Sequence, residues 1–584
     1  MRWVLVFAAL LSAASPVYAQ TKTITILHFN DVYEITPVEG GRAGGMARVA
    51  NFRARLKGKH PGLLTTLGGD YLSPSALGTA RVDGQRLAGR QMVDVLNFLG
   101  VDWATFGNHE FDVGEPAFRA RLAESKFKIV SSNVTDASGQ LFPGTVSTAV
   151  VPVKGAGGTV RVGLLGLTID SNLQPWVKYA DPVESARRAV AALEGHCDVI
   201  VALTHLALAG DQDVAENVPE IDLILGGHEH ENWLLRRGAR FTPIVKADAN
   251  VRTVAVVTLR VPPTGRPTVS TTFEEIDERV PEGPRTAAVV KKWVDQAFAA
   301  FRADGFDPAQ VVATIDTAID DRESAVRNRP TNGTDQILSA MRNETKTDIA
   351  IFNAGSIRLD DRLLPGPVTQ YDIIRVLPFG GKILKATFTG ALLKRVLDIG
   401  VQNRGTGGFL HSVGVPAVIE PAGRYTLAIT DFLLTGGEAN LGFLTRQNPD
   451  VSDIQEFRDI RMAVIDQLLL TAKKPGEPDA VPDHPHAHWS QAGESLVAAD
   501  QETGVQEITR SGVVGREVAY LPARVERERV IGTVTSRRRL SRRISSLAAV
   551  PTFESARMRI RADASSRVRP LNARMMSPAR RPAL

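Results

Sequence analysis

With 584 residues, the chain is longer than one hydrophobic core usually organises, and we expect two domains of roughly 200 to 300 residues. Hydrophobic residues make up 43% and charged residues 23%, a balance that excludes a largely disordered or membrane-spanning chain. The net charge of +5 comes from an arginine-rich C-terminal end, and the remainder, at about −6, gives no support for nucleic-acid binding by the folded domains.

The first residues show the pattern of a cleaved secretory signal. A positively charged start and an apolar stretch lead to the small-residue end Val17-Tyr18-Ala19, so we expect residues 1–19 to be removed. A membrane anchor is the alternative, but the apolar stretch is shorter than the roughly 18 to 20 residues that a span needs. We therefore expect an exported protein, periplasmic or extracellular, without a membrane span.

Residues 23 to about 260 alternate between apolar runs rich in β-forming residues and amphipathic helical patterns. The helical patterns include residues 46–58 and 89–100. The expected strands are TITILHF (23–29), GLLTTLG (62–68), WATFG (103–107), KIVSSN (128–133), RVGLLGLT (161–168), DVIVALTH (198–205) and LILGGH (223–228). This alternation predicts an α/β domain.

A long connecting helix is expected over residues 284–303, where apolar residues recur at helical spacing after an opening proline. Residues 310 to 471 form a second α/β region, which a helix near IQEFRDIRMAVIDQLLL (454–470) closes. Residues 473–584 are rich in Pro at first and then in Arg and Ser, without steady periodicity, so we expect a mostly disordered basic tail.

Six potential metal ligands follow the ends of five expected strands. They are Asp31, Asp70, Asn108, His205, His228 and His230. Open α/β sheets bind ligands at the carboxyl ends of their strands, and glycines beside these residues let the backbone turn sharply. A single such residue is usually a turn or a cap, but five strand ends together predict one site.

The ligand types indicate the chemistry of this site. Carboxylate, amide and imidazole ligands without thiolate suit borderline divalent ions such as Mn²⁺, Zn²⁺ or Fe²⁺. One central carboxylate can bridge two such ions roughly 3.5 to 4 Å apart, which generates a hydroxide nucleophile and neutralises a phosphoryl group. Asp70 is the candidate bridge, and we expect two divalent ions as cofactors.

The order D-x-Y, GD, GNHE, TH, GHEH resembles the signature of calcineurin-like metallophosphoesterases. In the second region, NAGSIR (353–358), VLPFGG (376–381) and DFLLTGGEANLG (431–442) are similar to a nucleotide-binding domain. Residues 23 to about 470 thus resemble the 5′-nucleotidase family. The resemblance implies a four-layer α/β/β/α catalytic domain (20–280), a connecting helix (284–303) and a C-terminal α/β substrate-binding domain (304–472).

The resemblance also implies roles for individual residues. Asp31, Asp70 and His230 would hold the first metal, and Asp70, Asn108, His205 and His228 the second. His109 would contact the phosphate and stabilise transition-state charge, with Asp112 orienting its imidazole. The implied substrate-binding residues are Asn353 for the base, Arg327 and Arg358 for ribose and phosphate, Phe379 and Phe432 around the base, and Glu438 for the ribose hydroxyls.

Tyr33 departs from the family pattern, which places a metal-binding histidine at this position. A phenol with a pKa near 10 is a weak ligand unless the metal deprotonates it. The first site would keep three protein ligands, which is still a normal catalytic arrangement. The alternative is that Tyr33 is a packed aromatic residue with a hydrogen-bonded hydroxyl.

The resulting hypothesis is a secreted dinuclear-metal phosphohydrolase that releases phosphate from nucleoside 5′-monophosphates by attack of a metal-bound hydroxide. One alternative is a hydrolase of UDP-sugars, 2′,3′-cyclic nucleotides or a sulfur ester on the same scaffold. Another is a nucleotide-binding protein whose catalysis is impaired by Tyr33. In each case the expected partner is a nucleotide or a related small molecule.

Overall fold

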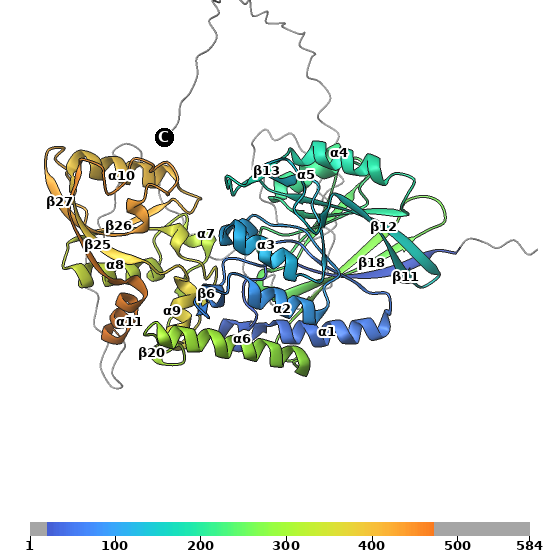
Figure 1. The fold of residues 1–584 in the computed structure, drawn as a ribbon, viewed down its shortest axis with the longest axis horizontal. Helices are drawn as coiled ribbons and strands as arrows, with labels where there is room; N and C mark the ends of the chain where they lie inside the picture. The colour runs from blue at the N-terminus through green and yellow to red at the C-terminus, as the bar shows by residue number, and fades with distance from the viewer. Residues whose placement is uncertain (1–19, 472–584) are drawn as a thin grey trace, which may run out of the picture. The chain divides into compact units, whose positions relative to one another are not determined.

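The computed structural model describes residues 20–471 (Figure 1). The expected signal (1–19) and the expected basic tail (473–584) lie outside the described residues. Within residues 20–471, none of the helices combines the length and apolar character needed to cross a membrane.

The first sheet has seven strands in the order β10-β8-β7-β4-β1-β18-β19. β1 pairs in parallel with β4, and β4 pairs in parallel with β7, so their carboxyl ends lie at one edge. The strands are β1 (Lys22–Phe29), β4 (Leu64–Leu67), β7 (Trp103–Ala104), β8 (Lys128–Val130), β10 (Thr145–Val146), β18 (Thr253–Val261) and β19 (Thr268–Glu275). β7 is shorter than the expected strand over 103–107, because the chain leaves the sheet after Ala104.

The second sheet has six strands in the order β11-β12-β14-β15-β17-β16. Its central strands β12, β14, β15 and β17 pair in parallel. The strands are β11 (Thr148–Gly155), β12 (Gly158–Thr168), β14 (Val199–His205), β15 (Leu223–Gly226), β16 (Trp233–Arg237) and β17 (Thr242–Lys246).

Alternating side chains explain how the two sheets stack. Ile24 and Ile26 of β1 belong to the apolar core that also holds Val162 and Val201 of the second sheet, whereas Leu27 and Phe29 point to the other face. Helices α1 (Met46–Lys59) and α2 (Arg90–Leu99) cover that outer face, and α4 (Pro182–Leu193) and α5 (Leu208–Asn217) cover the second sheet. This confirms the expected four-layer α/β/β/α arrangement.

The C-terminal region has its own five-stranded mixed sheet in the order β26-β22-β27-β25-β28. Its strands are β22 (Ile349–Asn353), β25 (Lys382–Thr389), β26 (Leu410–Val413), β27 (Arg424–Thr430) and β28 (Val451–Asp459). Apolar residues of α8 (Asn332–Thr345) and α11 (Ile460–Thr471) bury one face, and α10 (Gly390–Gln402) buries the other. The expected two-domain α/β fold is therefore confirmed.

One of the two helices expected from the sequence has the expected bounds, and the other begins later than expected. The connecting helix α6 (Pro284–Ala303) has the expected bounds, and it packs along α1 and α2, with Trp293 Nε1 donating to Asp94 2.9 Å away (Figure 1). The closing helix begins only at Ile460, because residues 451–459 pair with β25 as the edge strand β28. The remaining helices are α3 (Glu115–Glu124), α7 (Glu323–Val326) and α9 (Gln370–Val376).

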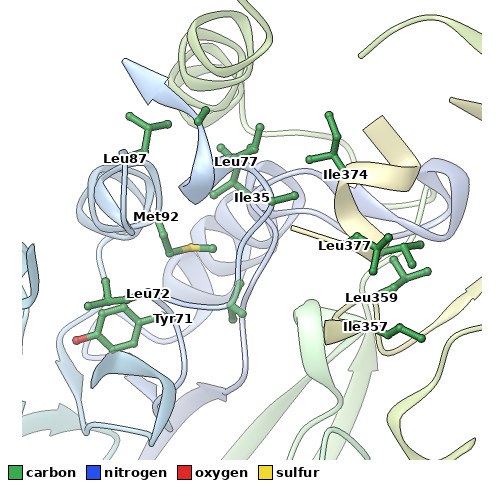
Figure 2. Close-up of a cluster of buried hydrophobic side chains, with 14 of the residues drawn as sticks. Ile35, Tyr71, Leu72, Leu77, Leu87, Met92, Ile357, Leu359, Ile374 and Leu377 are labelled. Atoms are coloured by element: carbon green, nitrogen blue, oxygen red, sulfur yellow. The ribbon is translucent and has the colours of Figure 1, made fainter. Parts of the chain in front are cut away.

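An apolar cluster joins the two regions. Figure 2 shows Ile35 and Leu77 of the N-terminal region near Ile374 of α9 and Leu377, which directly follows this helix, and all four side chains are buried in one core. A polar contact reinforces it, since the Tyr371 hydroxyl donates to Glu34 Oε2 at 3.2 Å. These contacts hold the C-terminal region against the edge of the first sheet where Asp31 lies.

Candidate functional site

Three expected metal ligands converge at the carboxyl ends of parallel strands. Asp31 follows β1, Asp70 follows β4 and His205 ends β14, so both N-terminal sheets contribute. One ligand atom from each residue lies within 4.8 Å of the others, and all three residues are buried. Asp31 and Asp70 both have left-handed backbones, with φ of 52° and 54°, a strained conformation that the surrounding structure must hold in place.

The Asp31 carboxylate is fixed by neighbouring donors. Its Oδ2 accepts from Asn30 Nδ2 at 2.7 Å and from the backbone N–H of His228 at 2.9 Å. Burial alone would raise the pKa of Asp31, but the imidazoles of His205 and His230 hold it well below its usual range. The carboxylate is thus ionised, and its Oδ1 faces the other ligands.

Glu110, which the sequence analysis did not single out, shapes the loop that carries Asp70. Its buried carboxylate accepts from the backbone N–H groups of Gly107, Tyr71 and Asp70, at 2.5, 2.7 and 3.0 Å. The backbone N–H of His109 donates to Asp70 Oδ1 at 2.8 Å. The sequence signal for Glu110 was its place as the last residue of the GNHE motif. The structure shows why an acidic residue stands there, because backbone N–H groups surround its carboxylate.

The residues expected at the second metal leave unsatisfied polar atoms. His205 Nδ1 donates to the carbonyl of Gly68 at 2.7 Å, which turns Nε2 toward Asp70 Oδ2, 3.1 Å away. Within residues 20–471, neither His205 Nε2 nor Asn108 Oδ1, both buried, has a hydrogen-bond partner of good geometry. Buried polar atoms rarely remain unpaired, so these two fit a bound cation. The His228 ring centroid lies 5.4 Å from that of His205, and burial lowers its pKa to about 3, which leaves a neutral ring able to bind metal.

Tyr33 places its hydroxyl among the residues expected at the first metal. The oxygen lies 3.2 Å from Asp31 Oδ1, 3.1 Å from Asp70 Oδ2 and 2.9 Å from His230 Nε2. His230 Nε2 itself lies 3.3 Å from Asp31 Oδ1. Burial and the carboxylates of Asp70 and Asp31 raise the pKa of Tyr33 well above its ordinary value, so the phenol is neutral. A neutral hydroxyl therefore lies among the residues expected at the first metal, at the sequence position where the resemblance implies a histidine.

His109 and Asp112 form the pair expected from the sequence. His109 Nδ1 lies 2.6 Å from Asp112 Oδ2, and Asn172 and Ser73 donate to the same carboxylate at 2.8 and 3.2 Å. Burial lowers the pKa of His109, but the carboxylates of Asp70 and Asp112 outweigh it, and the pKa is raised. These two carboxylates thus favour the protonated form of His109 beside the expected metal ligands.

A buried lysine that the sequence analysis missed holds two of the ligand loops. Lys246, at the end of β17, donates to the carbonyls of Leu206 and Gly227 at 2.6 and 2.7 Å. It pairs with Asp211 at 2.8 Å and also with Glu229, which lies between His228 and His230. A lysine inside the apolar run TPIVK (242–246) was the available signal.

The expected substrate arginines come together on one acidic residue. Glu323 at the start of α7 pairs with Arg327, and its Oε1 lies 3.5 Å from Arg358 Nη1. Arg358 also lies near enough to His109 for its charge to oppose the rise in the pKa of that imidazole. The structure therefore brings a guanidinium of the C-terminal region toward the metal ligands of the N-terminal region.

The expected base-binding residues also lie close together. Asp431 ties the Phe432 segment to the Phe379 segment, because it exchanges hydrogen bonds with the backbone of Lys382 at 3.0 Å. Both rings are unusually exposed for phenylalanine, Phe379 at 47% and Phe432 at 43%. Glu438 Oε2 accepts from Asn353 Nδ2 at 2.8 Å, so the residues expected for ribose and base are direct neighbours.

Comparisons with known proteins identify the family. Residues 24–232 match the family model of calcineurin-like phosphoesterases, and residues 311–423 match the 5′-nucleotidase C-terminal domain. The chain belongs to the 5′-nucleotidase family. Human 5′-nucleotidase is 27% identical over 451 residues, which cover 68% of this chain and 75% of that protein. The trifunctional nucleotide phosphoesterase protein YfkN of Bacillus subtilis is 28% identical over 372 residues, 55% of this chain, but the match spans only 25% of YfkN.

Solved structures share the fold of this family. The 5′-nucleotidase precursor from Thermus thermophilus aligns with a TM-score of 0.63 at 23% identity, over 78% of this chain and 98% of that one. The sulfate thiohydrolase SoxB of Thermus thermophilus aligns with a TM-score of 0.58 at 17% identity, over 77% of this chain and 94% of that one. The family relationships indicate a metal-dependent phosphoester hydrolase, with Asp31, Asp70 and His205 as a candidate metal site.

Proposed function

We propose that this protein is an exported 5′-nucleotidase that uses two divalent ions to hydrolyse nucleoside 5′-monophosphates. The observation that carries the proposal is the buried donor cluster of Asp31, Asp70 and His205, with His205 Nε2 turned toward Asp70 and with Asn108 Oδ1 buried without a hydrogen-bond partner in the described residues. Such a cluster is costly unless a cation compensates it, because ionised and unpaired groups lose their hydration on burial.

The ligand assignment is the one that the family resemblance implies, and the close approach of Asp31, Asp70 and His205 supports it. Asp31, Asp70 and His230 would hold one ion, with the Tyr33 hydroxyl beside them, and Asp70 would be shared with a second ion held by Asn108, His205 and His228. Two ions at such a site supply charge neutralisation and activation of a nucleophilic water. Carboxylate, amide and imidazole donors suit Mn²⁺, Zn²⁺ or Fe²⁺.

His109 is the proposed catalytic group outside the metal ligands. Its imidazolium donates a hydrogen bond to a phosphoryl oxygen and stabilises the negative charge that develops there. Asp112 accepts a hydrogen bond from Nδ1–H of His109. This contact would orient the ring so that Nε2–H faces the substrate. Asn172 and Ser73 keep the Asp112 carboxylate in place.

The C-terminal region would bind the nucleoside. The exposed rings of Phe379 and Phe432 offer two faces for a base, at roughly 1 to 3 kcal/mol per stacked base. Asn353 would bond the base edge and Glu438 the ribose hydroxyls. Arg358 and Arg327 present guanidinium groups, which match phosphate oxygens in a bidentate manner, once a substrate competes with Glu323 for them.

Two alternatives remain distinct in their chemistry. Hydrolysis of UDP-sugars, 2′,3′-cyclic nucleotides or a sulfur ester would use the same metal ligands with a different leaving group. Nucleotide binding with impaired catalysis would follow if the Tyr33 hydroxyl kept the first metal away. The retained His109 and Asp112 pair favours catalysis, because binding alone does not need a protonated imidazole.

A substrate panel tests the proposal. The full chain is incubated with AMP, UMP, UDP-glucose and 2′,3′-cyclic AMP, each with Mn²⁺, Zn²⁺ or Mg²⁺, and the products are separated by chromatography. We expect the highest kcat/KM for the 5′-monophosphates. A higher kcat/KM for UDP-glucose or the cyclic nucleotide would reassign the substrate. Nucleotide binding by calorimetry without turnover under any metal would support the binding protein instead.

A further inference from the structure

Asp360 of the C-terminal region contacts an expected metal ligand of the N-terminal region. It lies in the loop before the short strand β23 (Arg362–Leu363), and its Oδ2 is 2.5 Å from Nδ1 of His230. The other oxygen, Oδ1, accepts from the backbone N–H of Glu323 at 2.7 Å. One carboxylate thus ties His230 to the start of α7, the helix that carries Glu323 and precedes Arg327.

This contact fixes which nitrogen of His230 faces the site. With Nδ1–H donated to Asp360, Nε2 faces Asp31 Oδ1 at 3.3 Å and the Tyr33 hydroxyl at 2.9 Å. A carboxylate behind a metal-binding histidine holds the ring orientation and increases its basicity as a ligand. The contact therefore prepares His230 for a cation on its Nε2 side.

His205 and His230 are oriented by different parts of the chain. His205 donates its Nδ1 proton to the carbonyl of Gly68, within the N-terminal region. His230 depends on Asp360, which reaches it from the C-terminal region 130 residues further along the chain. The orientation of His230 thus depends on contact between the two regions, whereas that of His205 does not.

The neighbouring carboxylate shows that the contact is specific to Asp360. Asp361 pairs instead with Arg252 at 2.8 Å, another contact between the two regions. Asp361 is therefore a natural comparison, because its replacement weakens the same interface without touching His230.

We propose that Asp360 is a positioning residue that makes tight metal binding at the first site depend on contact with the C-terminal region. The inference rests on the proposed role of His230 as a metal ligand. It adds that a residue of the substrate-binding region sets the geometry of the metal centre. Because coupling between sites is reciprocal, bound metal should in turn favour the arrangement in which the two regions touch.

The test measures metal binding directly in the full-length protein. Metal-free wild type and the variants Asp360→Asn, Asp360→Ala and Asp361→Asn are titrated with Mn²⁺, and free Mn²⁺ is followed by electron paramagnetic resonance. We expect one of the bound ions to be weakened about 10- to 100-fold in Asp360→Ala and less in Asp360→Asn, which keeps an acceptor oxygen. Asp361→Asn should lose clearly less affinity than Asp360→Ala, because it leaves the contact between Asp360 and His230 in place. The Co²⁺-loaded proteins should show altered visible bands only when Asp360 is changed.

Two further measurements separate the possible failures. Thermal unfolding of each metal-free variant establishes that it is folded. Wild-type affinity in Asp360→Ala, or an equal loss in Asp361→Asn, would overturn the positioning role. His230→Ala tests the underlying ligand assignment: if it leaves both Mn²⁺ affinities unchanged, His230 is not a ligand, and the proposed metal centre fails together with this inference.

Discussion

The hydroxyl oxygen of Tyr33 lies 2.9 Å from Nε2 of His230, the nitrogen that we assign to the first metal. The same oxygen is within 3.2 Å of a carboxylate oxygen of both Asp31 and Asp70. Both sequence-based interpretations of Tyr33 therefore describe part of the structure. The ring is buried and its hydroxyl is hydrogen-bonded, but the hydrogen bonds are to the proposed ligands themselves.

Replacement of Tyr33 by histidine should strengthen metal binding. An imidazole binds divalent ions as a neutral ligand, whereas the Tyr33 phenol must first lose a proton whose pKa is raised by burial and by Asp70. We expect Tyr33→His to lower the Kd of the first ion about tenfold or to shift the metal preference, as measured by Mn²⁺ and Zn²⁺ titration. Tyr33→Phe is the control, since it keeps the ring and supplies no ligand. Identical affinities in all three proteins would assign Tyr33 to packing alone.

Lys246→Met should destabilise the N-terminal region strongly. It would leave Asp211 and Glu229 without their buried cation, and loss of one partner of a buried pair costs about 3 to 5 kcal/mol. Lys291→Met is the matched control, because Lys291 pairs with Asp295 on the exposed face of α6 and such pairs contribute little. The free energy of unfolding is measured by denaturant titration of the metal-free proteins. Equal stability of the two variants would show that the Lys246 network is not a structural support.

The pH dependence of turnover should report His109. Burial lowers the pKa of His109, but the carboxylates of Asp70 and Asp112 outweigh this effect and raise it, so the imidazolium extends to higher pH than for a free histidine and is lost as pH rises through the raised pKa. We therefore expect kcat/KM to fall on the alkaline side. Asp112→Asn removes one of these anions, so this fall should move to lower pH. An alkaline limb at the same pH in both proteins would exclude His109 as the group that titrates.

The two exposed phenylalanines should act on nucleotides and not on simpler esters. Phe379→Ala or Phe432→Ala should raise KM for AMP roughly tenfold, because each removes one stacking face. Turnover of ribose 5-phosphate, which has no base, should change little. Phe241→Ala is the control, since Phe241 is 66% exposed in the turn between β16 and β17. An equal loss on both substrates would mean that the rings support the fold of the region.

Local sequence pattern was sufficient to predict the ligands that follow parallel strands. Asp31, Asp70 and His205 each stand at a strand end, and parallel pairing brings such ends to one edge whatever the loops do. Glu110 and Lys246 were harder to predict. The only sequence signals were an acidic residue inside the GNHE motif for Glu110 and a lysine inside the apolar run TPIVK for Lys246. Asp360 left none, because its contact with His230 depends on how two distant regions pack. The start of α11 was misplaced for a similar reason, since residues 451–459 are a strand only because β25 offers an edge.

Asp70 is the residue on which the account depends most, because it is assigned to both ions. The most direct test measures phosphate release from AMP with Mn²⁺ by wild type and Asp70→Asn, with Asp295→Asn on the exposed face of α6 as the control. We predict turnover by wild type and Asp295→Asn, and a loss of at least about 1,000-fold in Asp70→Asn, as expected when charge stabilisation at a metal centre is removed. Unchanged turnover in Asp70→Asn would contradict the dinuclear centre.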